Sequence, residues 1–388
     1  MGKIKKHDQE YIKKQNKIMI LNVIRNKRPI SRADIAKITG MSPTSVGRIV
    51  SELEEIGLIK ETELFSNGVG RKAMLLDIDA KSVLNVGVYL NRDITRIGIV
   101  DFDGNIIKDE TIKYSTSGIA PEVVIDNLAD YIEKIINESN VDIKKINGIG
   151  IGIPGIIDFK LGKVVFSAQL GWRDIDVASR ITKKLNIRTT IDNTVKLKAL
   201  AESSQKAFED SHRIVLMSFG SGVGSALVID GEIFRGNKNI AGEIGHTTVE
   251  PNGMLCECGR RGCLQTYIAD SALIQEARKV SDVSSVRDIF DAANRKEDWA
   301  INILDMTATY ISIAINNVLC MYNPDTVILG GRLIESNPEI IDLINEKCEK
   351  YIWDPFKGTF KLVYSKLKND AVIIGAAALS LNTYLDMD

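Results

Sequence analysis

Three of the five cysteines in this sequence lie within eight positions of one another. Cys256, Cys258 and Cys263 form the group, and His246 lies ten residues upstream of the first of them. Thiolate and imidazole groups are the ligands that hold Zn²⁺ in closed tetrahedral sites. Because Cys-x-Cys is tighter than the usual zinc-finger spacing, these residues alone leave a metal site, a disulfide system and a chance grouping open.

The cellular compartment bears on that choice. The first seventeen residues are charged throughout and lack the apolar stretch that is typical of a signal peptide. No run of eighteen apolar residues follows, so we expect no membrane span. We therefore expect a cytoplasmic protein whose thiols stay reduced, and clustered cysteines in such proteins more often bind a metal than pair as disulfides.

Length and charge suggest two or three domains with different partners. The chain has 388 residues, of which 44% are hydrophobic and 26% charged, as in soluble globular proteins. Residues 1–76 carry 15 Lys or Arg against 8 Asp or Glu, a net charge of +7, whereas the remainder carries −8. A small basic domain on a larger acidic one favours a polyanionic partner for the first part, although a solvated charged segment would look similar.

The first eighty residues have the signals of a helix-turn-helix. A helix over residues 11–27 should end before Pro29, and Ser31 is a good N-cap for a second helix that Gly40 ends. A third helix should then begin with Ser42 as N-cap and proline at the first helical position. Two short helices joined by a tight turn are typical of modules whose second helix enters the major groove of DNA.

The third helix and the segment after it carry the predicted DNA contacts. Thr44, Ser45 and Arg48 should lie on the exposed N-terminal face of the helix, where short hydroxyls and one Arg suit phosphates and base edges. Two strand-like runs around a basic, glycine-rich tip predict a hairpin wing. A protein-interaction module remains the alternative. The predicted DNA-binding residues are Ser31, Arg32, Ser42, Thr44, Ser45, Arg48, Gly68, Arg71 and Lys72.

From about Val83 onward, strands alternate with helices and glycine turns. This texture predicts an α/β architecture of two lobes with a cleft between them. We expect a winged helix over 1–80, a first lobe over 81–200 with the helix 370–388 packed back on it, and a second lobe over 201–369. The glycine-rich turn at 219–224 is compatible with a phosphate loop, but tight packing of a hairpin explains it about as well.

The order of motifs along the chain resembles that of the ROK family of sugar kinases and sugar-responsive repressors, over about residues 15–385. In the repressor branch a winged helix precedes the kinase-like domain. The resemblance implies an actin-like domain of sugar-kinase type, similar to ribonuclease H, and a homodimer or homotetramer. The motifs that carry it are "IGIGIPGIID", "QLGW", "FGSGVGSALVIDGEIFRGNKNIAGEIGH", "CECGRRGC", "NPDTVILGG" and "IIGAAALS".

The resemblance also implies a metal. In the family one His and three Cys hold a structural Zn²⁺, and His246, Cys256, Cys258 and Cys263 fall on those positions. The chemistry of the four side chains agrees with such a site. The ion would secure a loop beside Glu243 and so connect the metal to the ligand site.

Two departures from the kinase pattern predict that the domain is not an enzyme. Where ROK kinases have Asp-x-Gly-Gly-Thr after the first strand, this chain has residues 89–93, Tyr-Leu-Asn-Arg-Asp, without either glycine. Where the family has its catalytic base, this chain has Thr194, which cannot accept a proton in that way near neutral pH. Phosphoryl transfer needs both features.

The implied sugar-contacting set is also altered. The family's Asn before Leu-Gly-Trp is Gln169 here, and its Glu after Gly-Cys-Leu is Gln265, which changes the hydroxyl pattern that the site would satisfy. Lys196 replaces an Asn; it would bind an anionic ligand such as a sugar phosphate, or be a solvated helix residue, and Arg92 carries the same ambiguity. The predicted ligand-binding residues are Gln169, Asn193, Thr194, Glu243, His246 and Gln265.

Taken together, the sequence predicts a sugar-responsive transcriptional repressor. It would bind double-stranded operator DNA through the winged helix and sense a carbohydrate or sugar-phosphate effector in a catalytically silent domain. The alternatives are an active ROK sugar kinase with a DNA-binding domain, and a regulator that responds to a protein partner or to zinc or redox state. The sign of the ligand effect stays open.

Overall fold

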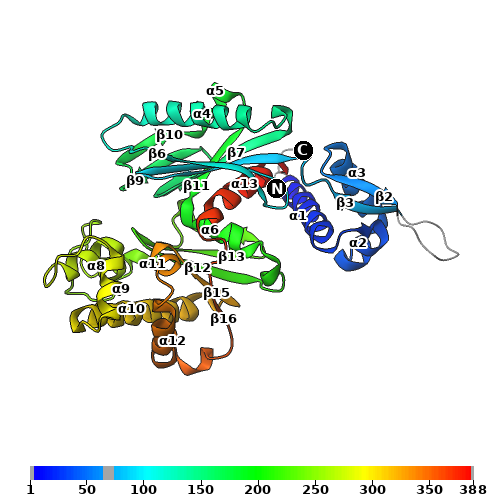
Figure 1. Ribbon diagram of the computed structural model, residues 1–388. Coiled ribbons are helices and arrows are strands. Elements are labelled where there is room, and N and C mark those ends of the chain that lie inside the picture. The colour runs from blue at the N-terminus through cyan, green and yellow to red at the C-terminus, as the bar shows by residue number, and fades with distance from the viewer. Residues whose placement is uncertain (1–3, 64–73, 386–388) are drawn as a thin grey trace. The chain divides into compact units, whose positions relative to one another are not determined.

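The structure is a computed structural model that describes residues 4–63 and 74–385 (Figure 1). The chain forms two compact units. Unit 1 comprises Met1–Asp192 together with Ala376–Asp388, and unit 2 comprises Asn193–Gly375. Unit 1 therefore holds both the N-terminal head and the first α/β lobe, and the last helix of the chain runs from unit 2 into unit 1.

The N-terminal head is a winged helix, as predicted. Three helices pack around one core, and a small antiparallel sheet has the strand order β1-β3-β2. The wing tip, which carries the predicted contacts Gly68, Arg71 and Lys72, lies outside the described residues, but the strands that lead to it are paired. The elements are α1 (Ile4–Lys27), β1 (Ile30–Ser31), α2 (Arg32–Thr39), α3 (Pro43–Glu55), β2 (Ile59–Glu63) and β3 (Met74–Ile78).

Local sequence signals explain where the helices of the head begin and end. The side chain of Ser31 accepts a hydrogen bond from the Asp34 amide, and Gly40 takes the left-handed conformation that ends α2. Ser42 caps α3 in the same way. The apolar stripe of α3, at three- and four-residue spacing, faces the core, where Val46, Ile49, Val50 and Leu53 are buried.

The first lobe is built on a five-stranded sheet with the order β11-β7-β4-β5-β6. Strands β4, β5 and β6 form an antiparallel meander, and β7 joins β4 in parallel. Helices α4 and α5 cover one face, and α13 lies on the other (Figure 1). The elements are β4 (Leu84–Leu90), β5 (Ile94–Val100), β6 (Ile106–Lys113), α4 (Pro121–Glu138), β7 (Ile146–Ile153), α5 (Ala178–Leu185), β11 (Thr189–Asn193) and α13 (Ala371–Leu385).

Glycines let α13 approach the sheet closely. A Cβ added to Gly150 of β7 would lie 1.8 Å from the carbonyl oxygen of Ala376 in α13. A second, three-stranded sheet with the order β10-β9-β8 extends the lobe. Its strands are β8 (Ile156–Asp158), β9 (Lys163–Ser167) and β10 (Trp172–Asp176).

Unit 2 repeats the same sheet plan, with the order β14-β13-β12-β15-β16. An antiparallel meander is again followed by parallel strands. Two lobes of this α/β type confirm the predicted fold class. The elements are α6 (Thr194–Ser203), β12 (Arg213–Phe219), β13 (Val223–Ile229), β14 (Glu232–Ile233), α7 (Gln265–Ile268), α8 (Asp270–Ala277), α9 (Val286–Asn294), α10 (Asp298–Tyr322), β15 (Thr326–Gly330), α11 (Arg332–Ser336), α12 (Ile340–Tyr351) and β16 (Lys361–Tyr364).

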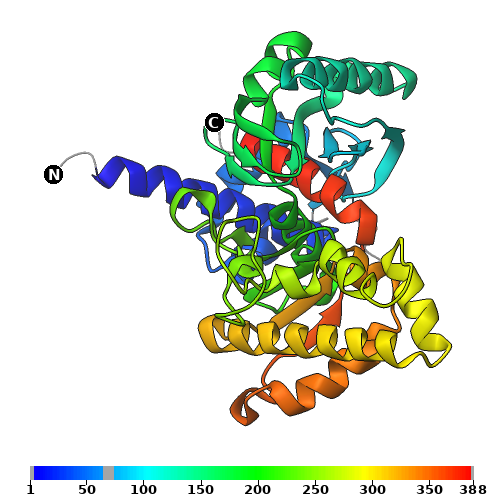
Figure 2. The ribbon, with the colours of Figure 1, turned by 90° about the vertical axis from the view of Figure 1, so that its left-hand side faces the viewer.

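The two faces of this sheet belong to two different cores. Along β12, Val215 and Met217 face a core that α7–α12 complete, whereas Ile214 and Leu216 face α6 on the other side. Helices α10 and α12 run side by side in both views (Figures 1 and 2). In the described part of the chain, α10 alone is long and apolar enough to cross a membrane, but 56% of its apolar stretch is buried inside the protein, which is typical of a core helix.

Candidate metal centre and ligand site

Two chain segments bring the metal-ligand candidates together. His246 ends a short 3₁₀ helix, Ile244–His246, and the three cysteines lie on the loop that follows it. An isolated antiparallel bridge joins Thr248 to Cys263. Gly262 makes this fold of the loop possible, because it has a φ of +70° and a Cβ there would lie 1.6 Å from the carbonyl oxygen of Glu250.

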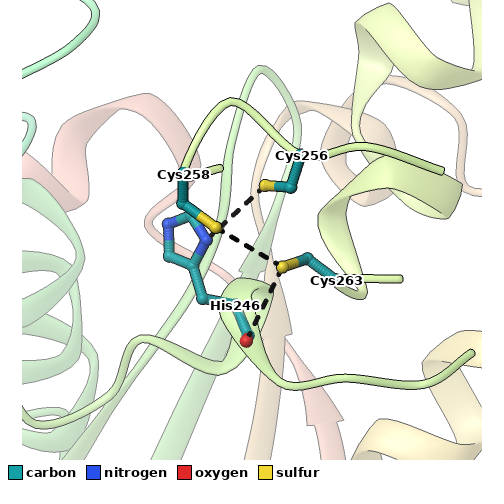
Figure 3. A group of neighbouring side chains, drawn as sticks. All are labelled: His246, Cys256, Cys258 and Cys263. Atoms are coloured by element: carbon teal, nitrogen blue, oxygen red, sulfur yellow. Dashed lines mark hydrogen bonds between the residues drawn. The ribbon is translucent and has the colours of Figure 1, made fainter. Parts of the chain in front are cut away.

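The four side chains point toward one another (Figure 3). One ligand atom from each of His246, Cys256, Cys258 and Cys263 lies within 4.8 Å of all the others. The Cys258 and Cys263 sulfurs are 3.6 Å apart, and the Cys256 sulfur is 3.8 Å from Nδ1 of His246. Two sulfurs at 3.6 Å are not a disulfide, whose S–S bond is about 2.05 Å.

The separations of 3.6 Å between Cys258 and Cys263 and 3.8 Å between Cys256 and His246 fit a tetrahedral ion. Ligands at about 2.0–2.3 Å from a Zn²⁺ centre lie roughly 3.5–3.8 Å from one another. The residues that the structure brings together can therefore hold a metal ion. Cys256 and Cys263 are buried while Cys258 is exposed, so the site has one open side from which an ion can enter.

The thiols of the cluster are not equivalent. A hydrogen bond from the backbone N–H of Arg260 is the main cause that lowers the pKa of Cys258 to about 6. Burial is the main cause that raises the pKa of Cys263 to about 12. A bound metal would stabilise all three as thiolates.

Gln265 lies beside this cluster. Its Nε2 atom is 3.4 Å from the Cys256 sulfur and donates to it. An amide can donate in this way, whereas a carboxylate at the same position cannot unless it is protonated. The structure thus brings one predicted ligand-binding residue, Gln265, into contact with the metal-ligand set.

Lys196 connects the start of α6 to the loop that leads to Glu243. The expectation that it is a solvated helix residue is wrong: Lys196 is 2% exposed. Its Nζ atom donates to the carbonyl oxygen of Asn239 over 2.7 Å, and Arg235 donates to the side chain of the same asparagine. Helical spacing could not reveal this burial, because the covering loop lies 43 residues further along the chain.

Opposing influences act on the Glu243 carboxyl. Burial raises its pKa, and the neighbouring Lys196 and His246 act in the opposite direction. The Lys196 ammonium is thus a compensating charge for Glu243. Asn239 is a residue of this site that sequence reasoning missed, since a backbone carbonyl acceptor leaves no signature in residue types.

The other predicted ligand residues divide between the two units. Asn193 is the N-cap of α6, where its Oδ1 accepts from the amides of Val195 and Lys196, and Thr194 is the first residue of the helix. Gln169 belongs to unit 1, where it is exposed in the turn between β9 and β10. Their roles as ligand contacts stay predictions.

The predicted DNA contacts on the head differ in how free their side chains are. Thr44 and Arg48 are exposed one helical turn apart on α3, and Ser45 bonds to the N-cap Ser42. Arg32 instead donates to the carboxylates of Glu54 and Glu61, each over 2.9 Å. The part of Arg32 in binding DNA stays a prediction.

Two family models match the chain. One describes the ROK family and matches residues 85–383, which is most of the chain. The chain belongs to the ROK family. The second model describes a winged helix-turn-helix DNA-binding domain and matches residues 13–60 of this ROK protein.

The similar proteins include transcriptional regulators and a sugar kinase. The xylose repressor of Bacillus subtilis is 30% identical over 98% of both chains. A crystal structure described as a ROK family transcriptional regulator, homologous to the E. coli MLC protein, has a TM-score of 0.83 at 25% identity and covers 97% of this chain and 98% of its own. The ROK hexokinase of Thermus thermophilus has a TM-score of 0.67 at 24% identity and covers 78% of this chain and 100% of its own.

Proposed function

We propose that this ROK protein is a sugar-responsive transcriptional repressor that works in the cytoplasm as a homodimer or homotetramer. The observation that carries the proposal is a winged helix and a ROK domain in one chain, aligned along nearly its whole length with a xylose repressor. The head binds operator DNA, and the ROK domain binds the effector.

DNA binding takes place through α3. The exposed side chains of Thr44 and Arg48 are suited to base edges and phosphates, and the capped N-terminus of α3 adds partial positive charge for phosphate. Ser31, Arg32, Ser42 and Ser45 flank this surface, and Gly68, Arg71 and Lys72 of the wing contact the DNA backbone or minor groove.

The metal is a structural Zn²⁺ held by His246, Cys256, Cys258 and Cys263. The donor set and its spacing support zinc, because three thiolates and one imidazole leave no open coordination position. Nδ1 of His246 faces the cluster, so its Nε2 remains available to a ligand hydroxyl. One side chain can in this way serve both the metal and the effector.

The effector is a carbohydrate bound by Glu243, His246 and Gln265, with Asn193 and Thr194 of the same unit completing the set. The buried ammonium of Lys196 balances Glu243, which supports a neutral polyol more than a sugar phosphate. Effector binding changes operator affinity by a coupling free energy of about 1–3 kcal/mol.

We propose that the ROK domain of this protein does not catalyse phosphoryl transfer. In the turn between β4 and β5, Asn91 donates to the Tyr89 hydroxyl over 2.6 Å and Arg92 contacts Ser117, so side chains occupy a turn that has no glycine. Thr194 cannot supply the base. The fold similarity to a hexokinase is the reason to test this point directly.

A direct test uses the purified full-length protein. Duplexes are selected from random-sequence DNA, and a panel of monosaccharides, sugar phosphates and short oligosaccharides is screened by thermal shift and then against the selected complex. We expect a neutral sugar that stabilises the protein and changes its DNA affinity, without sugar-dependent ATP hydrolysis. Failure to select any duplex would refute the repressor function. Sugar-dependent ATP hydrolysis would instead support the alternative of an active kinase. Release of the DNA by a chelator or by peroxide without sugar would favour a zinc or redox sensor.

A further inference from the structure

One aromatic residue of the first lobe is buried in the core of the DNA-binding head. Phe102 lies in the turn between β5 and β6, and it is 6% exposed. Its neighbours are the buried apolar residues of α1, α2 and α3, in a core that also includes Val83 and is contacted by Leu381. The hydrophobic core of the winged helix is therefore completed by residues from outside it.

The segment between head and lobe is bonded on both sides. The amide of Phe102 donates to the carbonyl oxygen of Ala80 over 3.0 Å. The hydroxyl of Ser82 donates to the carbonyl oxygen of Gly57, at the end of α3, over 2.6 Å. Because residues 80–83 bond to the lobe on one side and to the head on the other, they do not behave as a free tether.

An ion pair lies beside the aromatic contact. Arg28 at the end of α1 donates to the carboxylate of Asp103 over 2.6 Å, and Arg25 contacts the Asp103 carbonyl oxygen at 3.4 Å. The turn itself is rigid, since the Asp101 carboxylate accepts from the amides of Asp103 and Asn105 over 2.9 and 2.8 Å. The turn thus presents Phe102 and Asp103 to the head in a fixed geometry.

We propose that the β5–β6 turn anchors the DNA-binding head to the first lobe, with Phe102 and Asp103 as positioning residues for α3. The anchor fixes the direction of each recognition helix, so that two heads of one oligomer bind half-sites only at a set spacing. This inference rests on the proposed function, because it requires that the oligomer binds DNA through its heads.

Half-site spacing separates an anchored head from a tethered one. Inserting about 5 bp between two half-sites turns the second one to the opposite face of the duplex, since a helical turn is about 10 bp. An anchored pair of heads then loses the second contact and its avidity, which is worth about 100-fold or more. A tethered pair reaches both half-sites and loses little.

The probe is a two-half-site duplex selected from random-sequence DNA on the full-length protein, together with its 5-bp insertion and a single half-site. The variants are Phe102→Ala, which removes the aromatic ring from the head core, and Phe102→Leu, which keeps an apolar side chain there. The control is Asp109→Ala, which removes a carboxylate paired with Arg96 on the same two strands.

We expect the wild type, Phe102→Leu and Asp109→Ala to lose about 100-fold or more in affinity on insertion, and Phe102→Ala to lose less than about tenfold. Binding to the single half-site should be unchanged in all four, which shows that the head still folds. If Phe102→Ala no longer binds the single half-site, Asp103→Ala is used in its place, because this substitution removes the ion pair of the anchor and leaves the apolar core of the head intact.

The anchor proposal would be overturned if the 5-bp insertion left the DNA affinity of the wild type unchanged. It would also be overturned if Phe102→Ala, or Asp103→Ala where that variant decides, lost as much affinity on insertion as the wild type. A wild type that selects no duplex at all would instead refute the proposed function. The two failures are therefore distinguishable.

Discussion

Nδ1 of His246 faces the cysteine cluster, so a metal held there would leave Nε2 for another partner, and a change at the cluster should then reach the proposed ligand site. Cys258 offers a cleaner test, because it belongs to the cluster but not to the predicted ligand-binding residues. Replacing Cys258 by Ser removes an exposed ligand without disturbing the buried pair Cys256 and Cys263. Three remaining ligands give an open and weaker site.

For Cys258→Ser we expect the affinity for Zn²⁺ to fall by more than about 100-fold, beyond the about 10–100-fold that loss of an outer contact costs. Competition with a chromophoric chelator measures it. Cys320→Ser, at an exposed cysteine outside the cluster, is the control and should bind zinc as the wild type does. Equal zinc affinity in both variants would exclude the proposed ligand set.

At Lys196 the expected effect is on stability. Lys196→Met removes the donor to the Asn239 carbonyl and the charge that balances Glu243, so we expect a loss of about 1–3 kcal/mol in the free energy of unfolding. Denaturant unfolding measures the change. Lys198→Met on the same helix, which loses only the ion pair to Glu335 at 3.5 Å, should cost less. A larger loss at Lys198 would contradict the role given to Lys196.

Arg48 and Arg32 should differ in their contributions to DNA binding. Arg48 is exposed, whereas Arg32 must first leave two carboxylates. We expect Arg48→Ala to reduce the slope of log affinity against log salt by about one phosphate contact, and Arg32→Ala by less. Binding to a selected duplex at several salt concentrations tests this order, and the reverse order would assign the phosphate contact to Arg32.

The four candidate metal ligands were found from the sequence because they lie within eighteen positions of one another, although the residue types alone left a metal site, a disulfide system and a chance grouping open. Residue types predicted the Lys196 environment poorly. Its acceptor is a backbone carbonyl that reaches it only through the folded loop, and no periodicity within α6 announces such a contact. The ion pairs of Arg32 could not be predicted from the sequence either, since they join the start of α2 to the end of α3 and to β2.

At the scale of elements, the helix ends followed from local chemistry. Ser31 and Ser42 cap the helices that their positions predicted. Long-range packing was a different matter. The merging of the winged helix with the first lobe depends on Phe102, whose apolar character in a turn does not say which surface covers it.

The contact between β7 and α13 gives a prediction at this scale. Gly150→Ala places a methyl group against the backbone of Ala376, which cannot move aside without shifting the helix, and we expect a loss of about 2–3 kcal/mol in the free energy of unfolding. Gly148→Ala meets chiefly the hydroxyl of Ser380, a side-chain atom, so it should cost less than about 1 kcal/mol. Similar losses for both variants would argue against this close approach.

At the scale of the whole molecule, the two units share one helix. A chain cut after Gly375 loses the part of α13 that packs on the first lobe but keeps all four metal ligands. We expect unit 2 to stay folded and to bind zinc, while the unfolding transition of unit 1 disappears from the calorimetric trace. A truncated protein that retains the transition of unit 1 would show that the lobe does not need this helix.

The position of α13 also sets an order in time. Ribosomes synthesise the head and the first lobe before unit 2, whereas Ala376 at the lobe and Leu381 at the head core are made 184 and 189 codons after Asp192. Until then, the face of the first-lobe sheet that α13 covers is exposed. The nascent chain therefore exposes apolar surface of unit 1 during synthesis, and it completes the core of its DNA-binding head only after unit 2 has been made.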